Sequence, residues 1–205
     1  MSAALSNQDS DVSDAESMLE EANHRFQRML DTTLEEEDTT FNVLRSAESL
    51  SDDFPLEYRG KGSRRIAFDI DEEVLGRQAV VKFPRGLEKR EFNRSEAQTW
   101  QHFRSQEGYR EDILAEVISL GKGGRFLVQE EVAAKQAYRH YLEDGVLKSD
   151  WSPGSFLTSR LALTQVKNEL AAYDLNPSDL DSSAVGFEKG NYLQPKVYDY
   201  HWMPP

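Results

Sequence analysis

A lysine lies inside the most apolar strand-like segment of this chain. Lys82 follows Ala79-Val80-Val81 and precedes Phe83. An ammonium group inside a protein core is costly unless its long side chain reaches water or pairs with an anion. The segment therefore leaves two possibilities: a lysine at a strand end that reaches solvent, or a lysine that pairs with a carboxylate brought to it by the fold.

Glu96 is the candidate partner for this lysine. In a helix predicted between residues 86 and 108, Glu96 lies on the same apolar face as Phe92 and Trp100, four residues from each. A carboxylate that faces a core needs a cation, and Lys82 lies on the neighbouring predicted strand. We therefore expect an ion pair between strand and helix. The alternative is a helix rotated so that Glu96 faces water.

Composition limits the remaining chemistry. The 205 residues include no cysteine, which excludes disulfides and thiolate metal sites. The four histidines are too far apart in sequence for a helical His-x-x-x-His metal pair. The net charge of −13 opposes binding to phosphate backbones, so no nucleic-acid partner is expected. No apolar run reaches the ~20 residues of a membrane span and no secretory signal is present, so we expect no membrane association and a cytoplasmic location.

The hydrophobic share of 38% is low for a globular domain. Two explanations remain open. One is a folded core with a disordered acidic tail. The other is a halophilic protein, whose acidic surface stays soluble because high salt screens its self-repulsion.

Residues 1–53 are expected to form an acidic, partly disordered N-terminal arm. Residues 1–15 have little to bury and are expected to be disordered. Helical periodicity begins at Asp14 and returns at residues 40–50. These amphipathic helices must bury their apolar stripe, either by docking on the main domain or by binding a partner protein or a second copy of the chain.

The rest of the chain predicts an α+β fold. Strands are expected at 56–59, 64–70 and 78–83, then a helix, then a hairpin of strands 114–120 and 125–130 around the turn 121–124. Over residues 54–132 the pattern therefore predicts a meander of three strands, one helix and a two-stranded hairpin. For residues 133–205 the pattern predicts a helical segment to about Leu142, a helix at 156–173, and a final hairpin of 184–187 with 196–200.

Two further features have chemical potential. Gly60-Lys61-Gly62-Ser63 joins two strands, and glycine backbones can cradle a phosphate, although most such turns are only turns. Asp179 lies in a loop after a helix, and Asp199 lies in the predicted strand 196–200. Two converging carboxylates suit Mg²⁺ binding and orientation of a hydroxyl group. Asp179 alone is equally typical of a turn or a helix cap.

The order of these features resembles the protein-kinase-like fold, the family of protein kinases and small-molecule phosphotransferases, over residues 56–200. The resemblance implies an antiparallel five-stranded N-lobe with one helix, an abbreviated C-lobe, and ATP and Mg²⁺ as cofactors. Gly60, Lys61, Gly62 and Ser63 are similar to the glycine-rich loop, and Lys82 and Glu96 to the lysine–glutamate pair. Glu130 and Val132 are similar to the hinge that holds adenine. Asp179 is similar to the catalytic base, and Asp199 to the metal-binding aspartate.

Several residues depart from the family pattern. Ala184 stands five residues after Asp179, where the family has a metal-binding asparagine. Pro177-Ser178 replaces the usual His-Arg before the aspartate, and His201 replaces the glycine after the metal segment. The chain ends at Pro205, so the expected C-lobe is truncated.

The sequence is therefore compatible with three functions. The first is a minimal ATP/Mg-dependent phosphotransferase with an unknown acceptor. The second is a catalytically impaired, pseudokinase-like binding or regulatory protein, with the N-terminal helices as its arm for a protein partner. The third is an unrelated α+β interaction or structural protein, in which the order of residues is coincidental.

Overall fold

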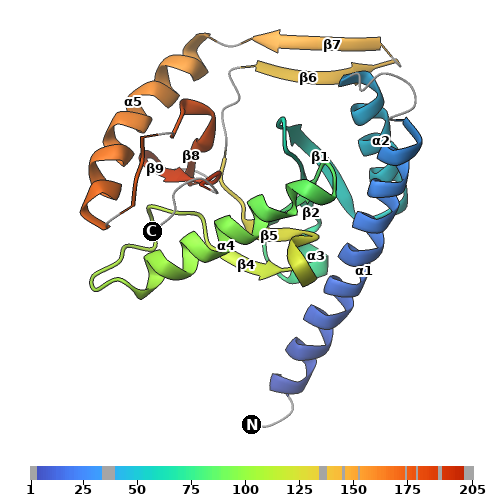
Figure 1. Ribbon diagram of the computed structural model, residues 1–205, viewed down its shortest axis with the longest axis horizontal. Coiled ribbons are helices and arrows are strands. Elements are labelled where there is room, and N and C mark those ends of the chain that lie inside the picture. Colours follow the sequence, from blue (N-terminus) through green and yellow to red (C-terminus); the bar gives the residue numbers. More distant parts are fainter. Residues whose placement is uncertain are drawn as a thin grey trace.

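The computed structural model describes residues 4–33, 40–133, 138–144, 146–151, 153–173, 175–178, 180–188 and 191–200. Over these ranges the chain is an α+β protein (Figure 1). Its α-helices are α1 (Ala4–Thr33), α2 (Thr40–Asp53), α3 (Glu72–Leu75), α4 (Arg90–Ser105) and α5 (Pro153–Leu170). Its strands are β1 (Leu56–Lys61), β2 (Arg65–Ile70), β3 (Ala79–Pro84), β4 (Val117–Leu120), β5 (Leu127–Glu130), β6 (Tyr138–Glu143), β7 (Val146–Trp151), β8 (Val185–Glu188) and β9 (Asn191–Val197).

A five-stranded antiparallel sheet with the order β1-β2-β3-β5-β4 forms the centre of the molecule. Strands β1 to β3 form a meander, and the chain then passes through α4 before returning to the sheet as β4 and β5. Side chains along a strand alternate between the two faces of a sheet. Val81 therefore points to the face opposite Lys82, and the same alternation determines which face of the sheet each of the other side chains lies on.

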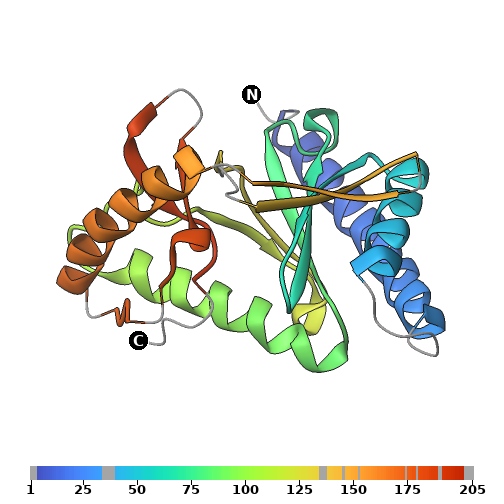
Figure 2. The ribbon, with the colours of Figure 1, turned by 90° about the horizontal axis from the view of Figure 1, so that it is seen from above.

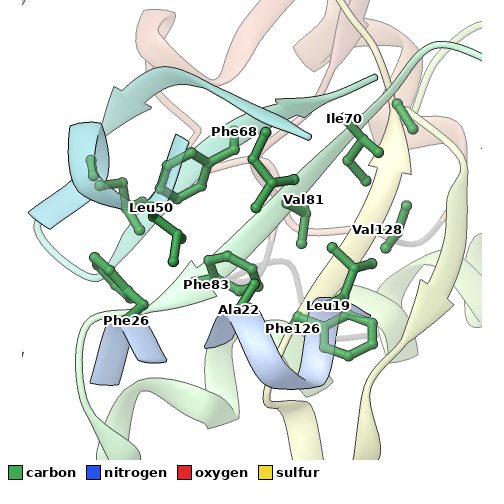
Figure 3. Close-up of a cluster of buried hydrophobic side chains, with 14 of the residues drawn as sticks. Leu19, Ala22, Phe26, Leu50, Phe68, Ile70, Val81, Phe83, Phe126 and Val128 are labelled. Atoms are coloured by element: carbon green, nitrogen blue, oxygen red, sulfur yellow. The ribbon is translucent and has the colours of Figure 1, made fainter. Parts of the chain in front are cut away.

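One face of the sheet packs against α1 and α2 (Figures 2 and 3). Phe26 of α1 is fully buried there against Phe68 and Phe83, with ring centroids 6.4 and 6.1 Å away. Leu50 of α2 is also fully buried. The amphipathic stripe of the N-terminal arm is therefore covered by the chain's own sheet. Helix α1 begins at Ala4, so the expectation of disorder over residues 1–15 is wrong from that residue onward.

Helix α4 packs on the other face of the sheet and continues into a second hydrophobic core. Its residues Trp100 and Phe103 are buried with residues of α5, β8 and β9. Glu96 lies one turn before Trp100, between the sheet and this second core, and is completely buried. The position of α4 thus places a carboxylate at the junction of the two halves of the molecule.

The segment after β5 differs from the prediction. A helix was expected from Glu131 to about Leu142. Residues 134–137 lie outside the described residues, but 138–143 are strand β6, which pairs with β7 (146–151) in an antiparallel hairpin. Tyr138, Tyr141 and Leu142 satisfy a helical period, but aromatic residues also favour strands, and pairing with β7 decides the outcome. Figure 1 shows the hairpin spanning the distance between α5 and α2.

The final hairpin is displaced from its predicted position. β8 pairs with β9, which ends at Val197, so Asp199 lies just beyond a strand rather than inside one. Gly186 allows β8 to approach the chain after β5, because an added Cβ would lie 2.7 Å from Val132 Cγ1. Ala133 and Phe187 exchange backbone hydrogen bonds of 2.8 and 3.1 Å at this contact. The hairpin is thereby fixed to the end of the main sheet.

In the part of the chain that the structure describes, no helix has both the length and the apolar character needed to cross a bilayer.

Candidate functional site

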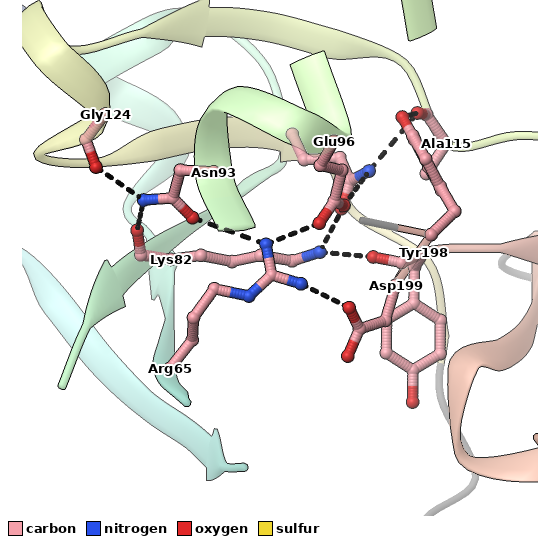
Figure 4. Close-up of polar contacts among 10 residues, drawn as sticks. Arg65, Lys82, Asn93, Glu96, Ala115, Gly124, Tyr198 and Asp199 are labelled. Atoms are coloured by element: carbon pink, nitrogen blue, oxygen red, sulfur yellow. Dashed lines mark hydrogen bonds and ion pairs between the residues drawn. The ribbon is translucent and has the colours of Figure 1, made fainter. Parts of the chain in front are cut away.

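Glu96 accepts hydrogen bonds from three different strands (Figure 4). Lys82 Nζ of β3 donates to its Oε1 at 2.7 Å, and Gln129 Nε2 of β5 donates to the same oxygen at 3.0 Å. Arg65 of β2 donates to Oε2. A buried carboxylate needs such donors to offset the loss of hydration. The predicted Lys82–Glu96 ion pair is present, and both alternatives to it are excluded.

The ammonium group of Lys82 also reaches the C-terminal segment. It donates to the backbone carbonyl of Tyr198 and lies 5.9 Å from the centroid of that ring. Burial lowers the pKa of Lys82 and outweighs the attraction of Glu96, while Arg65 acts in the same direction as burial. Lys82 therefore connects the sheet to the segment that carries Asp199.

Arg65 is a site residue that the sequence analysis did not identify. Its side chain is only 7% exposed, and its guanidinium bridges Glu96 and Asp199. It also donates to Asn93 Oδ1 at 3.3 Å, while Asn93 Nδ2 donates to the carbonyls of Lys82 and Gly124. Burial opposes the charge of Arg65, but Glu96 and Asp199 together outweigh it and raise the pKa of Arg65. Strand alternation could have identified Arg65 from the sequence, because it places this residue on the sheet face opposite Ile66 and Phe68.

Asp199 is brought to the same cluster by backbone pairing. Tyr198 N donates to the carbonyl of Ala184 at 2.9 Å, so the segment with Asp199 lies beside the loop that begins near residue 181. The Asp199 side chain is 39% exposed, in contrast to the buried Glu96. Asp179, the predicted catalytic residue, lies outside the described residues. Its neighbour Leu180 is buried in the second core.

The predicted glycine-rich loop forms the tip of the β1–β2 hairpin. Gly60 and Lys61 lie in β1, and Gly62 N donates to the carbonyl of Arg65 at 2.8 Å. An added Cβ at Gly62 would meet that carbonyl at 3.7 Å, an ordinary contact, so the turn itself does not require glycine. Ser63 is exposed at the tip. The loop therefore adjoins Arg65, the first residue of β2.

The predicted hinge residues are tied to the rest of the protein. Glu130 accepts from Lys196 Nζ at 2.7 and 2.8 Å, and Lys196 is only 7% exposed. The carbonyl of Val132 accepts from Arg59, which also pairs with Asp69. Lys196 and Arg59 are further residues that sequence reasoning missed, because both act across long sequence separations.

The arrangement combines two buried cations with one partly exposed carboxylate. Lys82 and Arg65 are both suited to bind phosphate oxygens, and Asp199 is a hard oxygen ligand. Among the described residues, no three acidic, histidine or cysteine side chains gather as a metal-ligand group. Mg²⁺ is commonly held by one or two carboxylates together with substrate phosphates and water, so Asp199 alone is compatible with a metal carried in by a phosphate ligand.

Comparisons with known proteins do not assign a family. No model of a protein family matches the chain, and no curated protein matches it significantly. The residues of the site and their geometry must therefore carry any functional conclusion.

Tyr200 gives a pH-dependent test of this cluster. Its hydroxyl donates to the carbonyl of Ala115 at 2.6 Å, and burial raises its pKa well above 10.0. Above pH 10 the unfolded chain loses a proton that the native chain keeps, so the free energy of unfolding falls by about 1.4 kcal/mol per pH unit for this group. Tyr200→Phe should remove this contribution to the pH dependence of the free energy of unfolding, measured by urea titrations between pH 8 and 11.

Tyr173→Phe, which removes a hydroxyl bonded to Gly108 O at the surface, is the control. An equal pH dependence in the two variants would contradict the raised pKa of the buried Tyr200 hydroxyl.

Proposed function

We propose that this chain is a minimal protein-kinase-like phosphotransferase that binds ATP with Mg²⁺. The observation that carries the proposal is the convergence of Lys82, Glu96 and Asp199 from β3, α4 and the segment after β9. Asp199 is far from the other two residues in sequence, and the resemblance to the family singles out the three as a set. The sheet order and the place of α4 between β3 and β4 support the same proposal.

In this proposal each side chain has a defined task. Lys82, held by Glu96, binds phosphate oxygens of ATP, and the backbone of residues 60–63 covers them. Asp199 holds Mg²⁺, which neutralises phosphate charge when bound. Asp179 orients the acceptor hydroxyl and takes its proton. The backbone around Glu130 and Val132 holds the adenine. Positioning and neutralisation of charge supply most of the catalysis of phosphoryl transfer.

A second candidate is a nucleotide-binding regulatory protein without turnover. Ala184 favours it, because this residue is 4% exposed, lies in the second core and has no side chain that could bind a metal. Loss of one ligand removes part of the electrostatic stabilisation of the transition state without abolishing ATP binding. The apolar residues of the N-terminal helices are already buried on the sheet, so a protein partner would have to bind the polar faces of these helices.

Ligand-dependent stability tests the nucleotide site. A ligand that binds only the native state stabilises it by about 2.7 kcal/mol at a concentration 100 times its Kd. Mg-ATP should therefore raise the melting temperature of the wild-type chain, and Lys82→Met should abolish the increase while the variant still folds. Lys122→Met, a change of an exposed lysine, is the matched control and should keep the increase. No increase at millimolar Mg-ATP in the wild type would reject the phosphotransferase and favour an unrelated α+β interaction protein.

Turnover separates the two nucleotide-binding candidates. Because the acceptor is unknown, release of phosphate from ATP is the measurement. Asp179→Asn should lower kcat by about 10²-fold or more, as expected for loss of a general base, with the ATP-induced stabilisation unchanged. Asp71→Asn, at the N-cap of the distant α3, should leave kcat as in the wild type. ATP binding without any turnover in the wild type would favour the regulatory candidate.

A further inference from the structure

Arg65 connects the two carboxylates of the site. Its guanidinium donates to Glu96 Oε2, Asp199 Oδ1 and Asn93 Oδ1, and its side chain is 7% exposed. Arginine remains charged under all ordinary conditions and has donors in a planar fork. Burial of this group is costly unless several acceptors satisfy it, and the cluster supplies three.

The cluster contains more cationic charge than Glu96 alone can neutralise. Lys82 and Arg65 both donate to this one carboxylate. The two charges are balanced only when Asp199 is included, and the Asp199 side chain is 39% exposed. A metal ion that approached Asp199 from solvent would compete with Arg65 for the same carboxylate.

Arg65 contacts Asp199 and Glu96, and a ligand can replace the contact with Asp199 more easily than the contact with Glu96. Glu96 is completely buried and receives Lys82 and Gln129 as well, so it holds one end of the guanidinium in place. Asp199 is partly exposed and is the most accessible member of the cluster. Arg65 Nη2 donates to Asp199, whereas Nη1 donates to Glu96 and Asn93. An anion that reached the guanidinium could therefore replace Asp199 as the acceptor of Nη2 while the bond from Nη1 to Glu96 stays in place.

We propose that Arg65 is a second phosphate-binding cation of the site. Without a ligand its guanidinium donates to Asp199; with a nucleotide bound it would donate to a phosphate oxygen instead, and Asp199 would then be the residue that holds Mg²⁺. This inference rests on the proposed binding of ATP and adds a residue to it. The chain thereby supplies, from β2, a fixed positive charge beside Lys82. Binding of metal and of polyphosphate at the site is coupled through one guanidinium.

The test compares ligands with and without phosphates. Kd values for Mg-ATP and for adenosine are measured by calorimetry with the full chain, and their ratio is compared among variants. Arg65→Gln should weaken Mg-ATP binding roughly tenfold to hundredfold, the value of a charge-assisted hydrogen bond, and leave adenosine binding unchanged. Arg64→Gln, a neighbouring exposed arginine that stacks on Phe92, is the control and should keep the wild-type ratio.

The conservative variant Arg65→Lys covers the case in which Arg65→Gln does not fold. It keeps the charge but loses the fork, so the preference for Mg-ATP over adenosine should fall by roughly threefold to tenfold. Equal losses of ATP and adenosine affinity would show a structural role only, and tighter ATP binding in Arg65→Gln would show that the arginine blocks the site; either result overturns the inference. A wild-type chain that binds neither ligand would overturn the proposed function itself, and the inference with it.

Discussion

One buried carboxylate determines how this protein is assembled. Glu96 has no exposed surface, and its oxygens accept from β2, β3 and β5. Removal of a carboxylate from water costs several kcal/mol, and only well-placed donors repay it. The sheet must therefore present Arg65, Lys82 and Gln129 on the face that α4 covers, with their apolar neighbours on the face that α1 and α2 cover. A single register shift in β3 would exchange these faces and leave Glu96 without its lysine.

The same cluster connects the two hydrophobic cores. Lys82 reaches the carbonyl of Tyr198, and Arg65 reaches Asp199, so both cations of the sheet contact the segment after β9. Lys196 adds a second connection through Glu130. Lys82 and Arg65 are also the proposed ligand-binding groups. An anion bound to them, as proposed, would change contacts that hold the two halves together, and the stability of the chain would then depend on occupancy of the site.

Much of the core and one ion pair were accessible from the sequence. The alternating residues 66–70 and the apolar run at 79–83 predict two strands, and the spacing of Phe92, Glu96 and Trp100 predicts the buried face of α4. Together they predict the Lys82–Glu96 pair correctly. Arg65 was missed because an arginine at a strand end is usually solvated, and only the pairing of β2 with β3 shows that its face is covered.

Other features depend on contacts that no local pattern contains. The hairpin of β6 and β7 has a sequence compatible with both periods, and the start of α1 lies in a segment whose composition is typical of disorder. The roles of Arg59 and Lys196 arise from bonds to residues 73 and 66 positions away.

A double-mutant cycle between Lys82 and Glu96 tests the central claim most directly. The free energy of unfolding in urea is measured for the wild type, Lys82→Met, Glu96→Gln and the double variant. Removal of one partner of a buried ion pair costs about 3–5 kcal/mol when the other charge is left uncompensated. Because Arg65 still pairs with Glu96 after Lys82→Met, the loss in that variant should lie at the lower end of this range. We predict that the double variant loses less stability than the sum of the two single losses, by about 1–3 kcal/mol. Strictly additive losses would show that the two side chains do not act as a pair, and would contradict the account of how this fold and its site are held together.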